Sequence, residues 1–140
     1  MVIDELPAWA NEMLRTARVG RLGLIDSGDR PRVLPVTFAI AGRALCSAID
    51  RKPKRSAEPA RLRYLRRRPQ AALTVDRYDD DWAELAWVQV LGSVEIIEIA
   101  DDPAALEALR SKYEQYRADP PPGPLLRLVP ERTLHWRASL

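Results

Sequence analysis

Cationic side chains are concentrated in one short stretch of this chain. The run Arg51-Lys52-Pro53-Lys54-Arg55 is followed at once by a second group of arginines: Arg61, Arg63, Arg66, Arg67 and Arg68. The formal net charge of all 140 residues is only +2. Guanidinium and ammonium groups bind phosphate and carboxylate oxygens through charge-assisted hydrogen bonds. The stretch therefore predicts a bound anion, which is a phosphorylated cofactor, a nucleic acid or an acidic membrane surface.

The place of this basic run in the sequence favours a phosphate site. The run follows a predicted strand that ends at Ser47-Ala48-Ile49, and it precedes a predicted helix. The free amides at the N-terminus of a helix attract anions. Lys52 and Lys54 are predicted to bind the phosphate. For the arginines of 61–68 two interpretations stay open, because such a run is either part of the anion site or a set of solvated charges on a helix.

Nucleic acid is the less favoured partner. Single-stranded nucleic acid binds to stacked aromatic rings along a basic groove, and Tyr64 is the only aromatic residue inside the basic stretch. Acidic residues follow soon after, at Asp76 and in the run Asp79-Asp80-Asp81, and they would repel an extended polyanion. We therefore expect no nucleic-acid partner.

Metal and hydrolase chemistry find no support in the residue pattern. The run Asp79-Asp80-Asp81 lacks the spacing of a calcium loop and is predicted to act in a loop and a helix cap. Cys46 and His135 are the only residues of their types, which leaves no disulfide and no zinc motif, and we expect a structural role for His135. No GxSxG, HExxH or Walker sequence is present.

The compartment is predicted to be the cytoplasm. A single cysteine is typical of a reducing environment, and no apolar run approaches the roughly 20 residues that a membrane span needs. Residues 1–18 carry charges among their apolar positions, so we expect neither a signal peptide nor a membrane anchor.

Periodicity and turn residues predict the elements that must position the basic stretch. We expect helices over 4–16, with Asp4 as cap, over 56–68, with Ser56 as cap, and over 103–116, beginning from Asp101-Asp102. We expect strands over 19–25, 32–40, 43–49, 71–75, 85–98 and 125–136, with the long one broken at Gly92-Ser93. Several strands are joined as hairpins, and no βαβ repeat is visible, which predicts an α+β, mainly β fold. We expect an antiparallel barrel or curled sheet that forms one domain over 1–140.

The tryptophans have two interpretations. Taken alone, Trp82, Trp87 and Trp136 are predicted to pack in the core. Beside a phosphate pocket they suit another role, because a flavin-like group needs cations for its tail and an apolar wall for its ring.

Four segments together resemble a known family. They are Arg32-Val33-Leu34-Pro35-Val36-Thr37-Phe38, Asp50-Arg51-Lys52-Pro53-Lys54, Leu62-Arg63-Tyr64-Leu65-Arg66-Arg67-Arg68-Pro69 and Val75-Asp76-Arg77-Tyr78-Asp79-Asp80-Asp81-Trp82. The chain is similar to the pyridoxamine 5'-phosphate oxidase-like (PPOX class) split β-barrel superfamily. Within it the chain resembles subgroup B of the flavin/deazaflavin oxidoreductases, which use coenzyme F-420. The resemblance implies an FMN-binding-like split β-barrel with peripheral helices.

The resemblance also implies a homodimer with a cofactor at each subunit interface. The strand Pro35, Val36, Thr37, Phe38 would line the ring through its backbone, and Ser47 would lie in the same site. The anionic tail would be held by Arg51, Lys52, Lys54 and Arg55, with Arg61 extending the cationic surface. Trp87 and Gln89 would approach the ring from the other subunit.

The implied reaction is hydride transfer between a reduced deazaflavin and a small organic acceptor, with no catalytic dyad. The product's proton would come from solvent or from a side chain such as Tyr78. Two alternatives stay open: an FMN-dependent oxidoreductase of the same fold, and a non-catalytic module that binds a flavin, a deazaflavin or a haem-type group.

Overall fold

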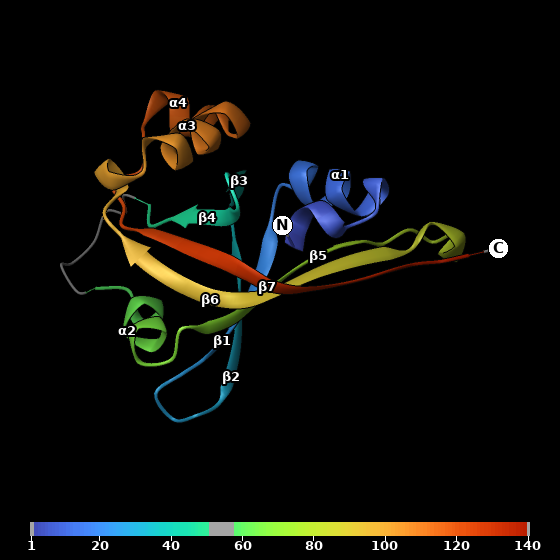
Figure 1. The fold of residues 1–140 in the computed structure, drawn as a ribbon, viewed down its shortest axis with the longest axis horizontal. Coiled ribbons are helices and arrows are strands. Elements are labelled where there is room, and N and C mark those ends of the chain that lie inside the picture. Colours follow the sequence, from blue (N-terminus) through green and yellow to red (C-terminus); the bar gives the residue numbers. More distant parts are fainter. Residues whose placement is uncertain (1, 51–57, 140) are drawn as a thin grey trace.

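In the computed structural model, which describes residues 2–50 and 58–139, the chain folds into an antiparallel sheet with helices packed around it (Figure 1). The described residues form seven strands in the order β2-β1-β5-β6-β7-β4-β3. The strands are β1 (Gly20–Ile25), β2 (Pro31–Val36), β3 (Ala39–Ala41), β4 (Ala44–Ala48), β5 (Gln70–Arg77), β6 (Ala86–Ile97) and β7 (Leu125–Arg137). The helices are α1 (Ala8–Thr16), α2 (Ala60–Arg67), α3 (Pro103–Lys112) and α4 (Glu114–Ala118).

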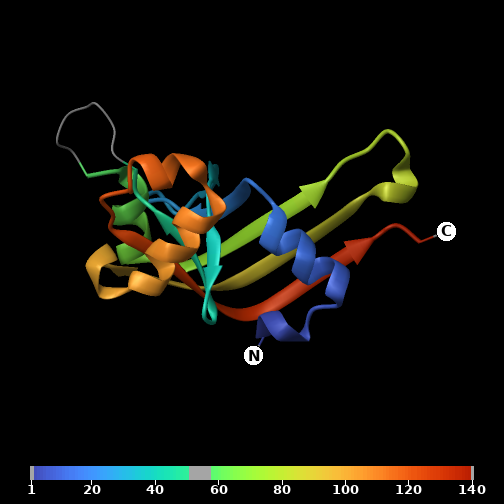
Figure 2. The same cartoon turned by 90° about the horizontal axis from the view of Figure 1, so that it is seen from above.

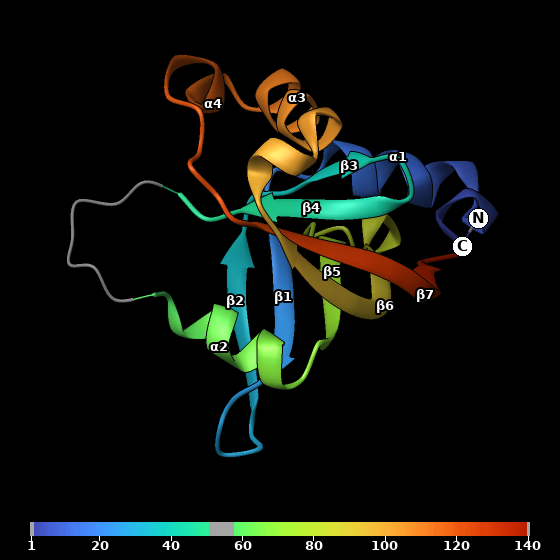
Figure 3. The same cartoon turned by 60° about the vertical axis from the view of Figure 1, so that its left-hand side comes forward.

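The sheet curls so strongly that its two edges face different helices. The helix α2 packs against β1 beside the β1–β2 hairpin, whereas α3 packs over β3 and β4 (Figure 3). Strands β5, β6 and β7 extend away from α3 and α4 toward the C-terminus (Figure 2). The predicted α+β, mainly β class with peripheral helices is confirmed.

One predicted strand, over 32–40, is in fact two strands on opposite edges of the sheet. Strand β2 pairs with β1, and β3 pairs with β4. Thr37 and Phe38 connect them and lie outside both ladders, because the chain must cross from one edge to the other here. Phe38 is fully buried at this crossing. Alternation of apolar residues does not reveal a crossing, since both halves have the composition of strands.

The predicted break in the long strand at Gly92-Ser93 is wrong. Strand β6 runs through both residues, and the irregularity is a shift of register against β7 between Leu91 and Gly92. A Cβ at position 92 would lie 2.0 Å from the carbonyl oxygen of Val129. The glycine therefore allows a close backbone approach inside a continuous strand and does not end it.

Prolines move the starts of two predicted helices. The first α-helix begins at Ala8, four residues after the predicted cap Asp4, and residues Val2–Glu5 form a separate 3-10 turn. A proline disfavours the helical conformation of the residue before it, so Pro7 excludes Leu6 from the helix. Helix α2 begins at Ala60, directly after Pro59, and the predicted cap Ser56 lies outside the described residues.

The predicted helix over 103–116 is two helices. Asp102 caps α3 as expected, because its carboxylate accepts a hydrogen bond from the amide of Ala105 at 3.1 Å. The chain then becomes extended at Tyr113, with φ −120° and ψ 116°, before α4 begins. This break directs Tyr113 and Tyr116 toward the crossing at Phe38, so it positions the site described below.

The apolar core has two parts. The larger lies inside the curled sheet around Phe38, Val88 and Val90, and α1 and α2 cover it with Leu14 and Leu65. The smaller lies between α3, α4 and the outer side of β3 and β4: Ala39, Ala44, Cys46, Ala48, Ala105, Leu109, Tyr113, Tyr116 and Leu125. The lone cysteine belongs to this second cluster, where burial raises the pKa of its thiol to about 11.

Candidate functional site

A cavity of about 200 Å³ lies where β2 ends, β4 ends and α2 begins. Its described lining residues are Val19, Pro35, Val36, Thr37, Ser47, Ala48, Asp50 and Arg61. The tertiary structure thus brings together five of the residues singled out in the sequence, namely Pro35, Val36, Thr37, Ser47 and Arg61. They come from three elements that are separated in sequence and meet only because the chain crosses between the sheet edges after Val36.

Arg61 is distinguished from the other arginines of its helix by its contacts. Its Nε atom is buried and has no hydrogen-bond partner among the described residues. A buried donor without a partner costs free energy unless a ligand or water satisfies it. Because Arg61 lines the cavity, its positive charge would attract an anion bound there.

The remaining arginines of the run hold parts of the protein itself. Arg63 donates to the carbonyl oxygen of Glu58 at 3.1 Å, and Arg66 pairs with the carboxylate of the same residue. Arg67 and Arg68 both pair with Asp29, at 3.4 and 3.0 Å, and so fasten the end of α2 to the β1–β2 hairpin. Among the described residues of this run, Arg61 is the one that lines the cavity.

Phe38 directly follows Thr37 but is not among the residues that line the cavity. Its side chain is 0% exposed. Its amide donates to the Tyr113 hydroxyl at 3.1 Å, and its carbonyl oxygen accepts from Lys112 Nζ at 2.9 Å. The Tyr113 hydroxyl also lies 2.8 Å from the carbonyl oxygen of Arg18. The backbone of Phe38 is therefore already bonded to α3, and its contact with a ring stays a prediction.

A hydrogen-bond network joins the cavity to α4. The Tyr116 hydroxyl donates to the Asp50 carboxylate at 2.5 Å and lies 2.9 Å from Thr37 Oγ1. Burial, and next the hydrogen bond to Asp50, raise the pKa of Tyr116 to about 12. The phenol therefore stays protonated at neutral pH, as a fixed donor between β2 and the end of β4.

A second cavity, of about 500 Å³, adjoins the first. It is lined by Thr37, Asp50, Tyr113, Gln115, Tyr116, Ala118, Asp119 and Pro121. Thr37 and Asp50 line both cavities. The second cavity is built from α4 and the loop after it, a part of the chain that carries no known motif.

Sequence reasoning missed Asp50, Lys112, Tyr113 and Tyr116 as site residues. Asp50 directly precedes the basic run, and the sequence alone gives it no role in the site. The two tyrosines are three residues apart, which suggests one face of a helix, but nothing local says that this face meets Thr37 and Phe38. Tyr116 is 79 residues from Thr37 in the sequence, and Tyr113 is 75 residues from Phe38.

Trp87 and Gln89 do not line either cavity. Both point to the outer face of β6, opposite in direction to the buried Val88 and Val90. Trp87 is 36% exposed and lies opposite Trp136 of β7, which is also partly exposed. The prediction that these two rings pack in the core is therefore wrong. Gln89 donates to the hydroxyl of Thr74 at 3.0 Å.

Several other predicted positions lie elsewhere. Arg51, Lys52, Lys54 and Arg55 lie outside the described residues. Tyr78 is 67% exposed in the connection after β5, which reaches the end of the sheet farthest from α4 (Figures 1 and 2). Trp82, 68% exposed, lies in the same connection and does not pack in the core.

The acidic run and the lone histidine have structural contacts. Asp81 caps the 3-10 turn Trp82–Glu84 by accepting from the amide of Ala83 at 3.1 Å, and His135 packs edge-on against Trp9 of α1 at 5.9 Å. Within 2–50 and 58–139, no three His, Cys, Asp or Glu side chains cluster as metal ligands would. In the same ranges, no helix combines the length and apolar character needed to cross a membrane.

Solved structures share this fold at low sequence identity. An FAD-binding protein from Mesorhizobium loti is 22% identical, with a TM-score of 0.71, over 96% of this chain and 96% of that one. A haem-binding protein from Mycobacterium smegmatis is 20% identical, with a TM-score of 0.74, over 95% of this chain and 55% of that one. An F420 reductase is 19% identical, with a TM-score of 0.68, over 92% of this chain and 98% of that one.

No curated protein sequence matches the chain. A family model does match, described as pyridoxamine 5'-phosphate oxidase, and it spans residues 8–132. This range contains every element from α1 to the middle of β7, including both cavities and the crossing between β2 and β3. The split-barrel architecture that the family resemblance implied is confirmed by the same match, and the chain belongs to the pyridoxamine 5'-phosphate oxidase family.

Proposed function

We propose that this protein is an oxidoreductase that uses coenzyme F-420 and transfers a hydride between the reduced deazaflavin and a small organic acceptor. The observation that carries the proposal is that Arg61 lines one cavity together with Pro35, Val36, Thr37 and Ser47. The likeness in fold to an F420 reductase and the resemblance of the basic run to deazaflavin-binding relatives support the same choice.

The described residues fit such a cofactor. Pro35, Val36 and Thr37 end strand β2 beside the cavity and would lie along the ring. Arg61 and Ser47 offer a cationic donor and a hydroxyl to the anionic tail. The cations of Arg51, Lys52, Lys54 and Arg55, which directly follow Asp50 in the sequence, would add to this charge.

When bound, the deazaflavin would supply the hydride, and the protein would supply orientation and a dry, charged environment. Thr37 and Asp50 line both cavities and would contact a ligand bound in either one. The Tyr116 hydroxyl would keep its proton and fix the Asp50 carboxylate. No dyad of acid and base is required of the chain.

The proposed assembly is a homodimer formed through the outer face of the sheet. Register places Pro35, Arg21, Thr74, Gln89 and Leu134 in one row across five strands, so the rim of the cavity and Gln89 share a face. The next row ends in Trp87 and Trp136, both partly exposed. Covering these tryptophans with a second copy would remove apolar area from water.

The alternative cofactor is FMN. The cavity of about 200 Å³ offers one described cation, Arg61, which would suit a short phosphorylated tail as well as a long polyanionic one. A non-catalytic module for a flavin or haem-type group is the remaining alternative, and the fold is shared with a haem-binding protein. Turnover of any acceptor by the loaded protein would exclude a purely binding role.

The test is a parallel titration with coenzyme F-420 and FMN, followed by quenching of tryptophan emission. We expect tighter binding of F-420, and we expect Arg61→Gln to weaken it by about tenfold, the loss of one charge-assisted hydrogen bond of ~1–3 kcal/mol. The matched control is Arg63→Gln, which removes a guanidinium from the same helix that bonds Glu58 and not the cavity. Preference for FMN would identify a flavin enzyme, and binding of neither cofactor would contradict the proposal.

A further inference from the structure

A smaller cavity, of about 220 Å³, is lined by residues of α1, β3 and α3 and has no part in the function proposed above. Its described lining residues are Arg15, Ala39, Ile40, Ala108, Ser111 and Lys112. The ε-amine of Lys112 is the strongest nucleophile among these side chains. We propose that Lys112 is a modification site, at which a small acyl phosphate transfers its acyl group to this amine. We call this cavity the Lys112 cavity.

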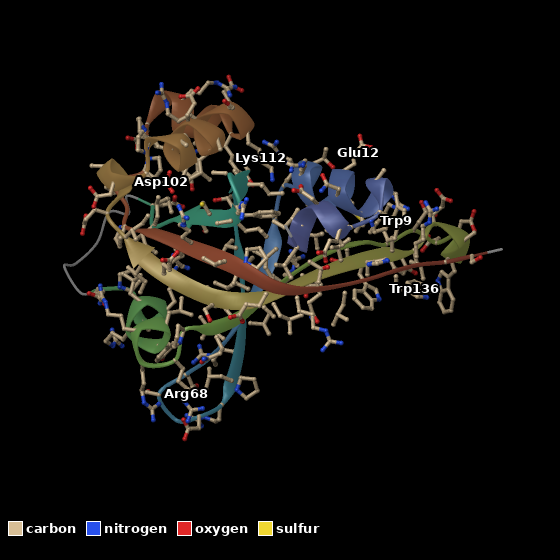
Figure 4. The ribbon with its side chains drawn as sticks, viewed as in Figure 1. Trp9, Glu12, Arg68, Asp102, Lys112 and Trp136 are labelled. Carbon is tan, nitrogen blue, oxygen red and sulfur yellow. The ribbon has the colours of Figure 1, made fainter. Side chains whose placement is uncertain are left out.

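The amine is held in place by the crossing between β2 and β3. Lys112 Nζ donates to the carbonyl oxygen of Phe38 at 2.9 Å and lies 4.1 Å from the centroid of the Phe38 ring (Figure 4). It lies 5.5 Å from the centroid of the Tyr113 ring. The hydrogen bond to Phe38 needs one N–H, which the neutral amine and the amide formed by acylation both have. The modification is therefore compatible with the contact that positions the amine.

The surroundings favour the neutral, nucleophilic form of this amine. Burial, and next the charge of Arg18, lower the pKa of Lys112 to about 8. At pH 8 about half of such amines are neutral, compared with less than about 1% for an ordinary lysine. Arg18 is itself held by stacking on the Tyr113 ring, 4.7 Å from its centroid. In the ranges 2–50 and 58–139, no carboxylate forms an ion pair with Lys112 that would favour its charged form.

The charge of the Lys112 cavity suits an anionic acyl donor. Arg15 of α1 also lines the cavity, and its Nε donates to the neutral amide of Asn11 at 2.6 Å. Arg15 and Lys112 belong to the last turns of α1 and α3, where each helix end carries a partial negative charge of about half an elementary charge. The full charges of Arg15 and Arg18 outweigh these partial charges even when Lys112 is neutral.

The size of the cavity limits the donor to a small molecule. A volume of about 220 Å³ is below the range of roughly 300–1,000 Å³ that is typical of sites for drug-sized ligands. Ala39 and Ala108 contribute short apolar side chains to the lining, which suit a small acyl group. Acetyl phosphate combines a methyl group of this kind with a phosphate for Arg15.

The proposed step is a simple acyl transfer. The neutral nitrogen of Lys112 attacks the carbonyl carbon of the donor, so that a carbon–nitrogen bond forms and the carbon–oxygen bond to phosphate breaks. The phosphate leaves with the electron pair of that bond, and the proton lost by the amine passes to phosphate or to water. Nothing is oxidised or reduced. The guanidinium of Arg15 would stabilise the charge of the leaving phosphate.

The test follows acetylation of each lysine by mass spectrometry of peptides. The chain has three lysines, namely Lys52, Lys54 and Lys112. The protein is incubated with acetyl phosphate at pH 8, and the reference is a synthetic peptide of residues 106–118, which has the same local sequence without the fold. We expect Lys112 to react at least tenfold faster in the protein than in the peptide. Equal rates, or a slower reaction in the protein, would overturn the proposal.

The pH profile of the same reaction tests the state of the amine. The rate at Lys112 in the protein should level off above about pH 8, whereas the rate in the peptide should keep rising toward the ordinary lysine pKa of about 10.4. Profiles that coincide would show an ordinary lysine and refute the site.

Variants of Arg15 test the preference for an anionic donor. Arg15→Gln should slow acetylation of Lys112 by acetyl phosphate at least fivefold and should leave the rate with neutral N-acetylimidazole within twofold. Arg15→Lys keeps the charge and should stay within threefold of wild type with both donors. The matched control is Arg63→Gln, which removes an exposed guanidinium from α2 and should change neither rate by more than twofold. If Arg15→Gln slowed both donors equally, or neither, the anionic donor would be refuted. None of these readouts requires a bound cofactor, so they are independent of the titrations with F-420 and FMN.

Discussion

Lys112 is a side chain of α3 that bonds the crossing between β2 and β3, beside the cavity lined by Arg61. Its Nζ donates a hydrogen bond to the carbonyl oxygen of Phe38 and lies 4.1 Å from the centroid of the Phe38 aromatic ring (Figure 4). Burial, and next the positive charge of Arg18, lower the pKa of Lys112 from 10.5 to about 8. The surroundings of Lys112 therefore disfavour the charged form of its ammonium group.

This shift predicts a pH dependence of stability. Between pH 8 and 10.5 the unfolded chain keeps a proton on Lys112 that the folded chain has released, so the free energy of unfolding should rise with pH across this window. Urea unfolding of wild type and Lys112→Met at several pH values isolates the effect, because Cys46 and Tyr116 titrate in both. The free energy of unfolding of wild type minus that of Lys112→Met should increase as the pH rises above 8. A constant difference would show that Lys112 does not titrate there.

Tyr113 is the second residue that anchors the crossing. Its hydroxyl accepts from the Phe38 amide and lies 2.8 Å from the carbonyl oxygen of Arg18. Tyr113→Phe would leave the buried amide unpaired, which we expect to lower the free energy of unfolding by about 1–3 kcal/mol in denaturant titrations. The matched control is Tyr64→Phe, because no described residue bonds the Tyr64 hydroxyl, and its effect should stay within about 0.5 kcal/mol. Equal losses in the two variants would contradict the anchoring role.

At the scale of elements, the pairing of β6 with β7 is the longest ladder and carries the bend of the sheet. The register shifts at Gly92, which lies opposite Pro130. The adjacent carbonyl oxygen of Val129 leaves no space for a side chain at Gly92. A glycine is therefore required at this position by contact with the neighbouring strand.

Gly92→Ala should destabilise the fold strongly. The new Cβ would lie 2.0 Å from the Val129 oxygen, so the two strands must move apart. We expect a loss of about 1–3 kcal/mol or more in the free energy of unfolding, measured in urea. Gly23→Ala is the matched strand control, because its Cβ would meet ordinary contacts no closer than 3.7 Å, and it should change stability little. A neutral Gly92→Ala would mean that the ladder tolerates separation here.

For the whole molecule, the proposed dimer predicts a mass twice that of the 15.9 kDa chain. Trp136, 46% exposed on the sheet face that also carries Trp87, should be covered in that dimer (Figure 4). Trp136→Glu should therefore shift the protein to monomers in sedimentation equilibrium, whereas the apolar Trp136→Phe should keep the dimer. A monomeric wild type, or a fully dimeric Trp136→Glu variant with unchanged affinity, would contradict the proposed interface.

The sequence by itself determined the local elements of this protein. Each of the seven strands overlaps a predicted β-prone run, and β1, β4 and β6 lie wholly inside one. Asp102 caps α3, and the family resemblance rests on four short segments around Val36, Asp50, Leu65 and Asp79. Such features depend on neighbours a few residues apart, where conformational preference and capping act directly. The starts of α1 and α2 differ from the predicted ones because a proline decides each boundary, whereas the break at Tyr113 between α3 and α4 involves no proline.

The tertiary structure alone decided which residues form the site. It divided one apolar run into β2 and β3, and it brought Arg61 to the cavity while tying Arg67 to the hairpin. It also set Tyr116 against Thr37, 79 residues away in the sequence. Contacts at such separation depend on how the curled sheet closes and on which side chains it buries, and no local pattern encodes that geometry.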